Sequence, residues 1–316
     1  MLKIRKHTSL YQRYPSVVSA SNRDRRRSPT LIYGQGIYPD TVEAIEAALG
    51  EALGITAAWK VGQYDCLLIS QPYSEVLAQT VIAHHLDVAN VQDVPDLHEP
   101  GLVVMDMDST AIQIECIDEI AALAGVGEEV AAVTERAMQG ELDFAQSLRQ
   151  RVATLEGADE AILTQVRESL PMMPELRELV ATLHHYGWKA AIASGGFTYF
   201  SDYLKQELDL VHAESNTLEI VEGKLTGKVL GDIVDAQAKA TILHRLAAQY
   251  DIAPHNTVAV GDGANDLVMI KAAGLGVAYH AKPKVEAASP VAVRYAGLGA
   301  IICVLSVSLL PHHLSW

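Results

Sequence analysis

Two aspartates, Asp106 and Asp108, directly follow the apolar run 102–105. A short apolar run of this kind is typical of a buried strand, and in open α/β sheets ligands bind at the carboxyl ends of strands. One carboxylate there could act as a nucleophile and the other as a proton donor. Acidic residues are also common after strands as turn formers or helix caps, so this pair alone does not establish a catalytic site.

A second segment with the same placement is Ser194-Gly195-Gly196-Phe197, which follows the strand-like run 189–193 and precedes a helical stretch. A small hydroxyl and two glycines allow backbone N–H groups to approach an anion, which the N-terminus of a helix also favours. An ordinary helix N-cap is an equally good explanation when the segment is considered alone.

A third strand end, after 257–260, carries a glycine-rich loop that contains Asp262, Asn265 and Asp266. Carboxylate and amide oxygens are ligands that a hard cation such as Mg²⁺ prefers, although a simple turn would use the same residues. Lys239 lies between these motifs, in the amphipathic stretch 235–250. A lone lysine on a helix is usually solvated, so Lys239 matters only through its place in the series.

In this order, the four segments resemble the motif series of the haloacid dehalogenase superfamily. The forms DxDST, SGGF and GDGAND are similar to those of its phosphoserine phosphatase branch, from about residue 101 to 281. The resemblance implies that Asp106 is the nucleophile and that Asp108 protonates the leaving group and later activates water. The dehalogenases themselves lack a carboxylate at the place of Asp108.

The same resemblance implies a Mg²⁺ site formed by the carboxylates of Asp106 and Asp262 and the backbone carbonyl of Asp108, with Asp266 supporting these ligands. It also implies that Ser194, Gly195 and Lys239 bind the phosphate. This assignment agrees with the chemistry, because an attacking carboxylate needs cations and N–H donors to neutralise the oxygens of a nearly dianionic phosphate ester.

The insertion between the first two motifs, residues 111–170, has helical spacing of apolar residues throughout and predicts a small all-helical cap over the site. In the cap, the resemblance implies that Glu115 holds the amino group and Arg151 the carboxylate of phosphoserine. Met138 and Phe144 match apolar residues that line the same pocket, and Asn265 is expected to contact the substrate. On local grounds alone, the two charged residues would be surface groups and the two apolar ones cap-core residues.

Composition indicates a soluble enzyme of about two domains: 316 residues, 49% hydrophobic, with a formal charge of −15. This charge argues against a nucleic-acid partner. Three widely spaced cysteines suggest reduced thiols in a cytoplasm. The longest apolar stretch, 299–310, is too short to span a bilayer and predicts a terminal helix packed on the core, so no membrane partner is expected.

The chain divides into four parts. Residues 1–29 are basic, lack an apolar signal core and predict a solvated or partly ordered tail, with an organelle transit peptide as the alternative. Residues 30–92 predict a βαββαβ domain that resembles ACT-like modules, for which amino-acid binding and formation of a homodimer are hypotheses. Residues 93–100 form a linker. Residues 101–316 predict an α/β phosphatase domain, a three-layer Rossmann-like fold with a mostly parallel sheet, and include an appended hairpin at 218–230 to which no role is assigned.

The resemblance implies Mg²⁺-dependent hydrolysis of O-phospho-L-serine through an aspartyl phosphate, as the last step of serine biosynthesis. A phosphotransferase that passes the same phosphoryl group to another hydroxyl is the alternative. A non-catalytic amino-acid-binding protein is disfavoured because the set of catalytic residues is intact.

Overall fold

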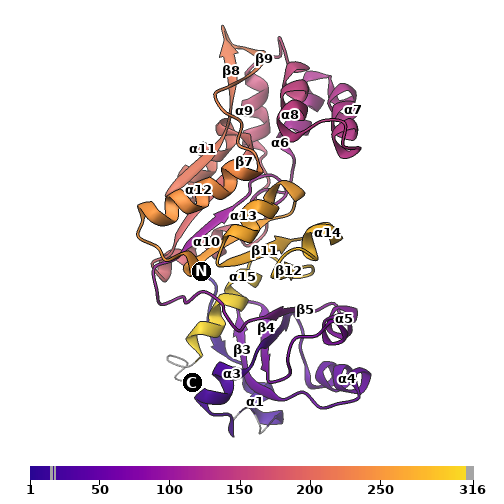
Figure 1. Cartoon of the computed structure of the whole chain (residues 1–316), viewed down its shortest axis with the longest axis vertical. Helices are drawn as coiled ribbons and strands as arrows, with labels where there is room; N and C mark the ends of the chain where they lie inside the picture. The colour runs from indigo at the N-terminus through magenta and orange to yellow at the C-terminus, as the bar shows by residue number, and fades with distance from the viewer. Residues whose placement is uncertain (15–16, 18, 311–316) are drawn as a thin grey trace.

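The protein contains two sheets, one of five strands and one of seven, in two units stacked along the long axis of the molecule (Figure 1). The computed structural model describes residues 1–14, 17 and 19–310. The last six residues of the predicted phosphatase domain, 311–316, lie outside the described residues.

The seven-stranded sheet has the order β12-β11-β10-β6-β7-β8-β9 and is parallel except for β9. Its central strand, β6 (Leu102–Met105), lies between β10 (Thr257–Gly261) and β7 (Lys189–Phe197), so the three strands that carry the motifs end side by side. The others are β8 (His212–Val221), β9 (Lys224–Leu230), β11 (Leu275–Tyr279) and β12 (Val291–Val293). The strands predicted at 102–105, 189–193 and 257–260 and the hairpin at 218–230 are confirmed, although β8 begins earlier than the predicted hairpin.

Every residue of β6 is buried, because helices cover both faces of this sheet. Leu102 and Val104 pack in one hydrophobic cluster with α12, whereas Val103 and Met105 pack in another with α10. The predicted three-layer α/β fold is therefore confirmed. The helices are α10 (Leu176–His185), α11 (Thr198–Leu208), α12 (Ala236–Gln249), α13 (Leu267–Ala272), α14 (Pro283–Glu286) and α15 (Ala300–Leu305), with single 3-10 turns at Pro254–Asn256, Ala264–Asp266 and Ser306–Leu309.

Four helices form a cap above the carboxyl end of this sheet: α6 (Cys116–Ala124), α7 (Gly127–Met138), α8 (Phe144–Ala153) and α9 (Ala161–Glu168) (Figure 1). They fall within the segment for which the sequence predicts helices. The two chain crossings into the cap pair with each other, since Ile112 bridges Met172 and the Gln113 N–H donates to the Pro171 carbonyl at 2.9 Å.

The smaller sheet has the order β1-β3-β4-β2-β5 and contains the predicted βαββαβ series. That series is β2 (Thr30–Gly34), α4 (Pro39–Leu49), β3 (Ile55–Val61), β4 (Tyr64–Ile69), α5 (Glu75–Ala83) and β5 (Asp87–Asn90).

The N-terminal segment, predicted as a solvated or partly ordered tail, has secondary structure in its described residues. Strand β1 (Ile4–Lys6) pairs antiparallel with β3, and helices α1 (Thr8–Arg13) and α3 (Asn22–Arg27) follow it. Leu2, Leu10 and Val17 are buried. The basic composition of this segment concealed a few widely spaced apolar residues, which are enough to fix it to the sheet because each is buried against a neighbouring element.

The two units share a polar and apolar interface. The Asp87 carboxylate in β5 accepts three backbone N–H bonds, from Arg294, Tyr295 and Ala296, at 2.8–3.2 Å. Trp59 Nε1 donates to Ser306 Oγ at 2.8 Å, just beyond α15. The predicted terminal helix is confirmed, because all six residues of α15 are buried, and it packs on β2 and β4 of the smaller sheet. In the described part of the chain, no helix is long and apolar enough to cross a membrane.

Candidate active site

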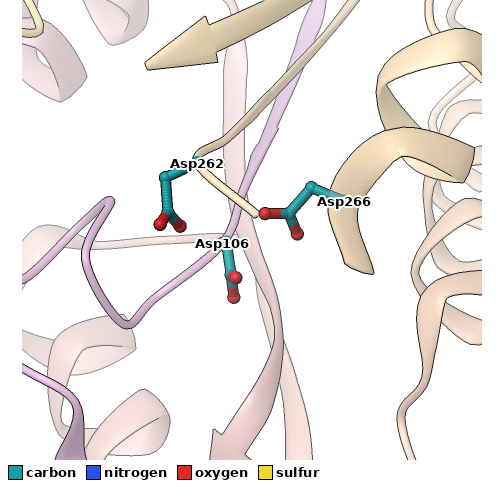
Figure 2. Close-up of side chains that lie close together, drawn as sticks. All are labelled: Asp106, Asp262 and Asp266. Carbon is teal, nitrogen blue, oxygen red and sulfur yellow. The ribbon is translucent and has the colours of Figure 1, made fainter. Parts of the chain in front are cut away.

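Three carboxyl groups meet at the carboxyl ends of β6 and β10. Figure 2 shows Asp106 and Asp262 at the strand ends and Asp266 approaching from the helical side. One oxygen from each lies within 4.8 Å of the others. Asp106 is fixed by its backbone N–H, which donates to the Val260 carbonyl at 2.9 Å. Three anions so close together in a mostly buried place require positive charge nearby.

Lys239 supplies part of that charge. Its ammonium nitrogen is fully buried and lies 2.8 Å from Asp106 Oδ2 and 2.7 Å from Asp266 Oδ1. Burial alone would lower the pKa of Lys239, but the attraction of the two carboxylates outweighs it and raises the pKa. Lys239 of α12 is therefore a buried residue paired with two carboxylates and not a solvated lysine on the helix surface.

The carboxylates of Asp106 and Asp262 fit a divalent cation. Both oxygens of Asp266 are occupied, one by Lys239 and the other by the Gly263 N–H at 3.0 Å. Asp262 accepts a long hydrogen bond from Thr110 Oγ1, at 3.4 Å, and its pKa is raised to about 6 by burial and by repulsion from Asp106. A hard cation that prefers oxygen ligands would relieve this repulsion, so the donor set of Asp106 and Asp262 suits Mg²⁺.

The environment of Asp108 differs from that of Asp106. Its Oδ1 atom is buried and has no hydrogen-bond partner among the described residues. Burial, followed by repulsion from Glu115 and Asp106, raises its pKa well above the usual value for a carboxyl group. A raised pKa favours the protonated carboxyl group, which is the state that a proton donor needs.

The loop at the end of β7 lies against both the sheet and the cap. Ser194 Oγ accepts the Gly196 N–H at 3.0 Å, which shapes the turn. A Cβ atom at Gly195 would lie 2.5 Å from the Phe144 ring, so only glycine fits under this cap residue. The loop therefore brings backbone N–H groups close to the carboxylates without a side chain in between.

A cavity of about 510 Å³ separates the cap from the sheet. Glu115, at the start of α6, and Arg151, in α8, face it from the cap side. Glu115 Oε1 accepts a hydrogen bond from Ser109 Oγ at 2.8 Å, whereas the buried Nε of Arg151 has no partner among the described residues. Phe144 also lines the cavity, and Met138 lines it with 67% of its surface exposed.

The structure brings the predicted site residues together. Ten of the twelve line the cavity, namely Asp106, Asp108, Glu115, Met138, Phe144, Arg151, Ser194, Gly195, Asp262 and Asn265. The other two, Lys239 and Asp266, lie behind its floor as a buried pair. The acidic loop contributes Asn265 to the lining and Asp266 to the pair.

Among the cavity residues that sequence reasoning missed, two are charged: Lys282 and Lys284, which follow β11 and flank Pro283. The placement rule that singled out the other motifs would have found them, because they also follow a strand of the parallel sheet. Their positive charge adds to that of Lys239 and Arg151 around a cavity with an acidic floor.

Comparison with known proteins gives two matching family models. One, described as haloacid dehalogenase-like hydrolase, matches residues 100–274. The other, a domain of unknown function, matches residues 26–90, so the likeness of that segment to ACT modules stays a prediction.

Individual proteins match over most or all of the chain. The phosphoserine phosphatase of Vibrio cholerae is 60% identical over 316 residues, which cover 100% of this chain and 96% of that protein. The crystal structure of a probable phosphoserine phosphatase from Vibrio cholerae, in its unliganded form, is similar with a TM-score of 0.91 and covers 98% of this chain and 96% of that one. A structure of a phospho-aspartyl intermediate analogue of phosphoserine phosphatase is 38% identical, with a TM-score of 0.61, and covers 65% of this chain and 98% of that one.

Proposed function

The chain belongs to the phosphoserine phosphatase family of the haloacid dehalogenase-like hydrolases, and from this premise we propose that it hydrolyses O-phospho-L-serine through an aspartyl phosphate on Asp106. The observation that carries the proposal is the charge arrangement of one cavity. Lys239 and the loop at Ser194 lie at its sheet side, and Glu115 and Arg151 lie at its cap side. This arrangement is complementary to a phosphate ester that also bears an ammonium and a carboxylate.

Asp106 and Asp262, with the backbone carbonyl of Asp108, would hold Mg²⁺. When bound, this ion neutralises charge on the oxygens of the transferred phosphoryl group. The crowding that raises the pKa of Asp262 through burial and the nearby Asp106 supports a cation at this place.

In the first step, a carboxylate oxygen of Asp106 attacks phosphorus and the bond from phosphorus to the serine oxygen breaks. Asp108 donates its proton to that oxygen, so serine leaves as the neutral alcohol. In the second step, the Asp108 carboxylate accepts a proton from water, the water oxygen attacks phosphorus, and the bond to Asp106 breaks. The raised pKa of Asp108, caused by burial and by its acidic neighbours, supports its role as the donor.

Substrate choice follows from the cap. The Nε of Arg151, which has no partner among the described residues, supports a role in binding the substrate carboxylate, since Arg can bind such a group through two parallel hydrogen bonds. Glu115 would bind the ammonium group, and Phe144 and Met138 would enclose the short carbon chain between them. Asn265 lies in the same cavity and would contact the substrate from the sheet side.

The test is release of inorganic phosphate, with and without Mg²⁺, from L-phosphoserine, phosphothreonine and p-nitrophenyl phosphate. We expect selective, Mg²⁺-dependent hydrolysis of phosphoserine, and none by Asp106→Asn. Activity on p-nitrophenyl phosphate alone would reject the substrate, and turnover by Asp106→Asn, with deamidation excluded by mass spectrometry, would reject the nucleophile. Loss of free phosphate on adding an alcohol acceptor would instead identify a phosphotransferase.

A further inference from the structure

The hairpin formed by β8 and β9 connects the loop at Ser194 with the cap. At its base, Asn216 in β8 is buried, and its Nδ2 donates to the Gly195 carbonyl at 2.8 Å. Its Oδ1 accepts the Val234 N–H at 2.9 Å, so both ends of the amide are occupied. The hairpin is therefore attached by the buried side chain of Asn216 to the backbone of the loop at Ser194, which is called the phosphate loop below.

At its other end, the hairpin pairs with the cap segment 157–160, which joins α8 to α9. The Gly157 N–H donates to the Leu225 carbonyl at 2.8 Å, the Leu225 N–H to the Ala158 carbonyl at 2.9 Å, and the Glu160 N–H to the Gly223 carbonyl at 3.0 Å. Because β9 is the outer strand of the sheet, this pairing covers an edge that would otherwise be open. Figure 1 shows the hairpin rising beside α8 and α9.

Gly227 is one place where β9 lies against the end of α8. Its φ is +76°, and a Cβ atom there would lie 3.1 Å from the Cβ of Glu156 and 3.2 Å from both the Cα and the carbonyl oxygen of Ala153. Ala153 is the last residue of α8 and lies two residues beyond Arg151. The backbone of the hairpin thus rests directly on the end of the helix that carries the guanidinium group.

We infer that the β8–β9 hairpin is a strap that fixes the distance between Arg151 and the phosphate loop, and that Gly227 is the positioning residue through which it does so. This inference rests on the proposed function. A strap of fixed length favours phosphate esters whose carboxylate lies at one separation from phosphorus. Esters without a carboxylate do not depend on it. The strap then holds the cap in addition to the paired crossings at Ile112 and Met172 and the hydrogen bond between Thr164 Oγ1 and the Tyr199 hydroxyl, at 2.8 Å.

The decisive comparison is Gly227→Ala against Gly231→Ala. Gly231 has nearly the same φ, +74°, but a Cβ atom there would meet nothing within 4 Å, so this variant controls for the backbone change alone. We expect KM for phosphoserine to rise about ten-fold or more in Gly227→Ala, because small displacements of a positioning group are costly. Turnover of p-nitrophenyl phosphate should match that of Gly231→Ala. An unchanged KM, or equal losses on both substrates, would overturn the inference.

A second variant changes an exposed ion pair of the strap, so we expect it to fold normally. Lys224 Nζ lies 3.1 Å from Asp159 Oδ2, and both side chains are more than half exposed. Lys224→Asp places two carboxylates opposite each other and should raise KM for phosphoserine about two- to five-fold, the range of an exposed ion pair. Adding Asp159→Lys should restore it. An unchanged KM in Lys224→Asp, or a double variant that stays as impaired as Lys224→Asp, would contradict the strap.

Hydrogen exchange separates the strap from the proposed function. In Gly227→Ala, the amides of Gly157 and Glu160 should exchange faster than in Gly231→Ala, whatever substrate the enzyme uses. Unchanged exchange would reject the strap even if phosphoserine is the substrate. Faster exchange in an enzyme that does not hydrolyse phosphoserine would reject the proposed function and keep the strap.

Discussion

At the scale of single residues, the charge balance of the site depends on Lys239. Replacing it by Met leaves Asp106 and Asp266 buried without the cation that lies 2.8 and 2.7 Å from them. Removing one partner of a buried pair costs about 3–5 kcal/mol of the free energy of unfolding. We expect kcat to fall by about 10²–10³, the effect of losing one donor to a transferring oxyanion.

The double variant Lys239→Met with Asp266→Asn distinguishes the two effects. Neutralising Asp266 removes one unpaired charge, so thermal stability should recover in part while phosphate release stays low. Recovery of both stability and turnover would mean that Lys239 serves only to neutralise Asp266.

Arg151 carries a separate prediction on specificity. Arg151→Ala should raise KM for phosphoserine by about 10- to 100-fold, because a hydrogen bond to a charged group contributes about 1.5–3 kcal/mol. Turnover of p-nitrophenyl phosphate should change little. Arg149→Ala is the matched control, since Arg149 is an exposed residue of the same helix. Equal losses on both substrates, absent in the control, would show that Arg151 is structural.

At the scale of elements, the sequence predicted best the helices and strands whose formation depends on residues close together in the chain. The strands at 102–105 and 257–260 are short apolar runs, and their adjacency follows from the parallel architecture, which brings the ends of such strands to one edge. The amino-acid pattern therefore placed Asp106 and Asp262 at the same edge of the sheet, and the family resemblance placed them in one metal site. The contacts that were missed join distant segments. Nothing in the local pattern of 4–6 indicates pairing with β3, and nothing in 223–225 indicates the cap as its partner.

Asp65 links the N-terminal segment, whose strand was not predicted, to the smaller sheet. Its Oδ1 lies 3.1 Å from His7 Nε2 and also pairs with Lys60, while its Oδ2 accepts the Ile37 N–H at 2.9 Å. Burial alone would raise the pKa of Asp65, but the hydrogen bonds from His7 and Lys60 outweigh it and lower the pKa. An unfolded Asp titrates at about 3.9, so this carboxylate stabilises the fold above that pH and loses its contribution as the pH falls through its lower folded value.

We therefore expect Asp65→Asn to lower the free energy of unfolding by about 3 kcal/mol at neutral pH, where a buried pair is broken. The difference in the free energy of unfolding between the variant and the native protein should persist down to about pH 5 and shrink below about pH 4. Urea unfolding at a series of pH values measures it. A difference that stays constant down to the lowest pH would show that the charge of Asp65 makes no contribution.

At the scale of the whole molecule, Glu175 links the two units at the point where the chain leaves the cap. Its Oε2 accepts hydrogen bonds from the Tyr64 hydroxyl of the smaller sheet, at 2.8 Å, and from the Gly299 N–H before α15, at 2.9 Å. The backbone of Glu175 is left-handed, with φ +67°, a conformation that costs free energy in any residue with a side chain. Its contacts with both units offset this strain, which explains how the conformation persists.

Glu175→Ala removes the carboxylate that offsets the strain of the left-handed backbone, and it leaves the Gly299 N–H and the Tyr64 hydroxyl without this acceptor. The cost should be about 1–3 kcal/mol, equivalent to about 2–4 °C in the melting temperature for each kcal/mol. Calorimetry should show the transition lowered and separating into two, since the units would unfold with less coupling. Asp209→Ala is the control, because Asp209 is an exposed residue with φ +53° at the end of α11, away from this contact. Equal shifts in the two variants would mean that the coupling between the units resides in Asp87 and Trp59 instead.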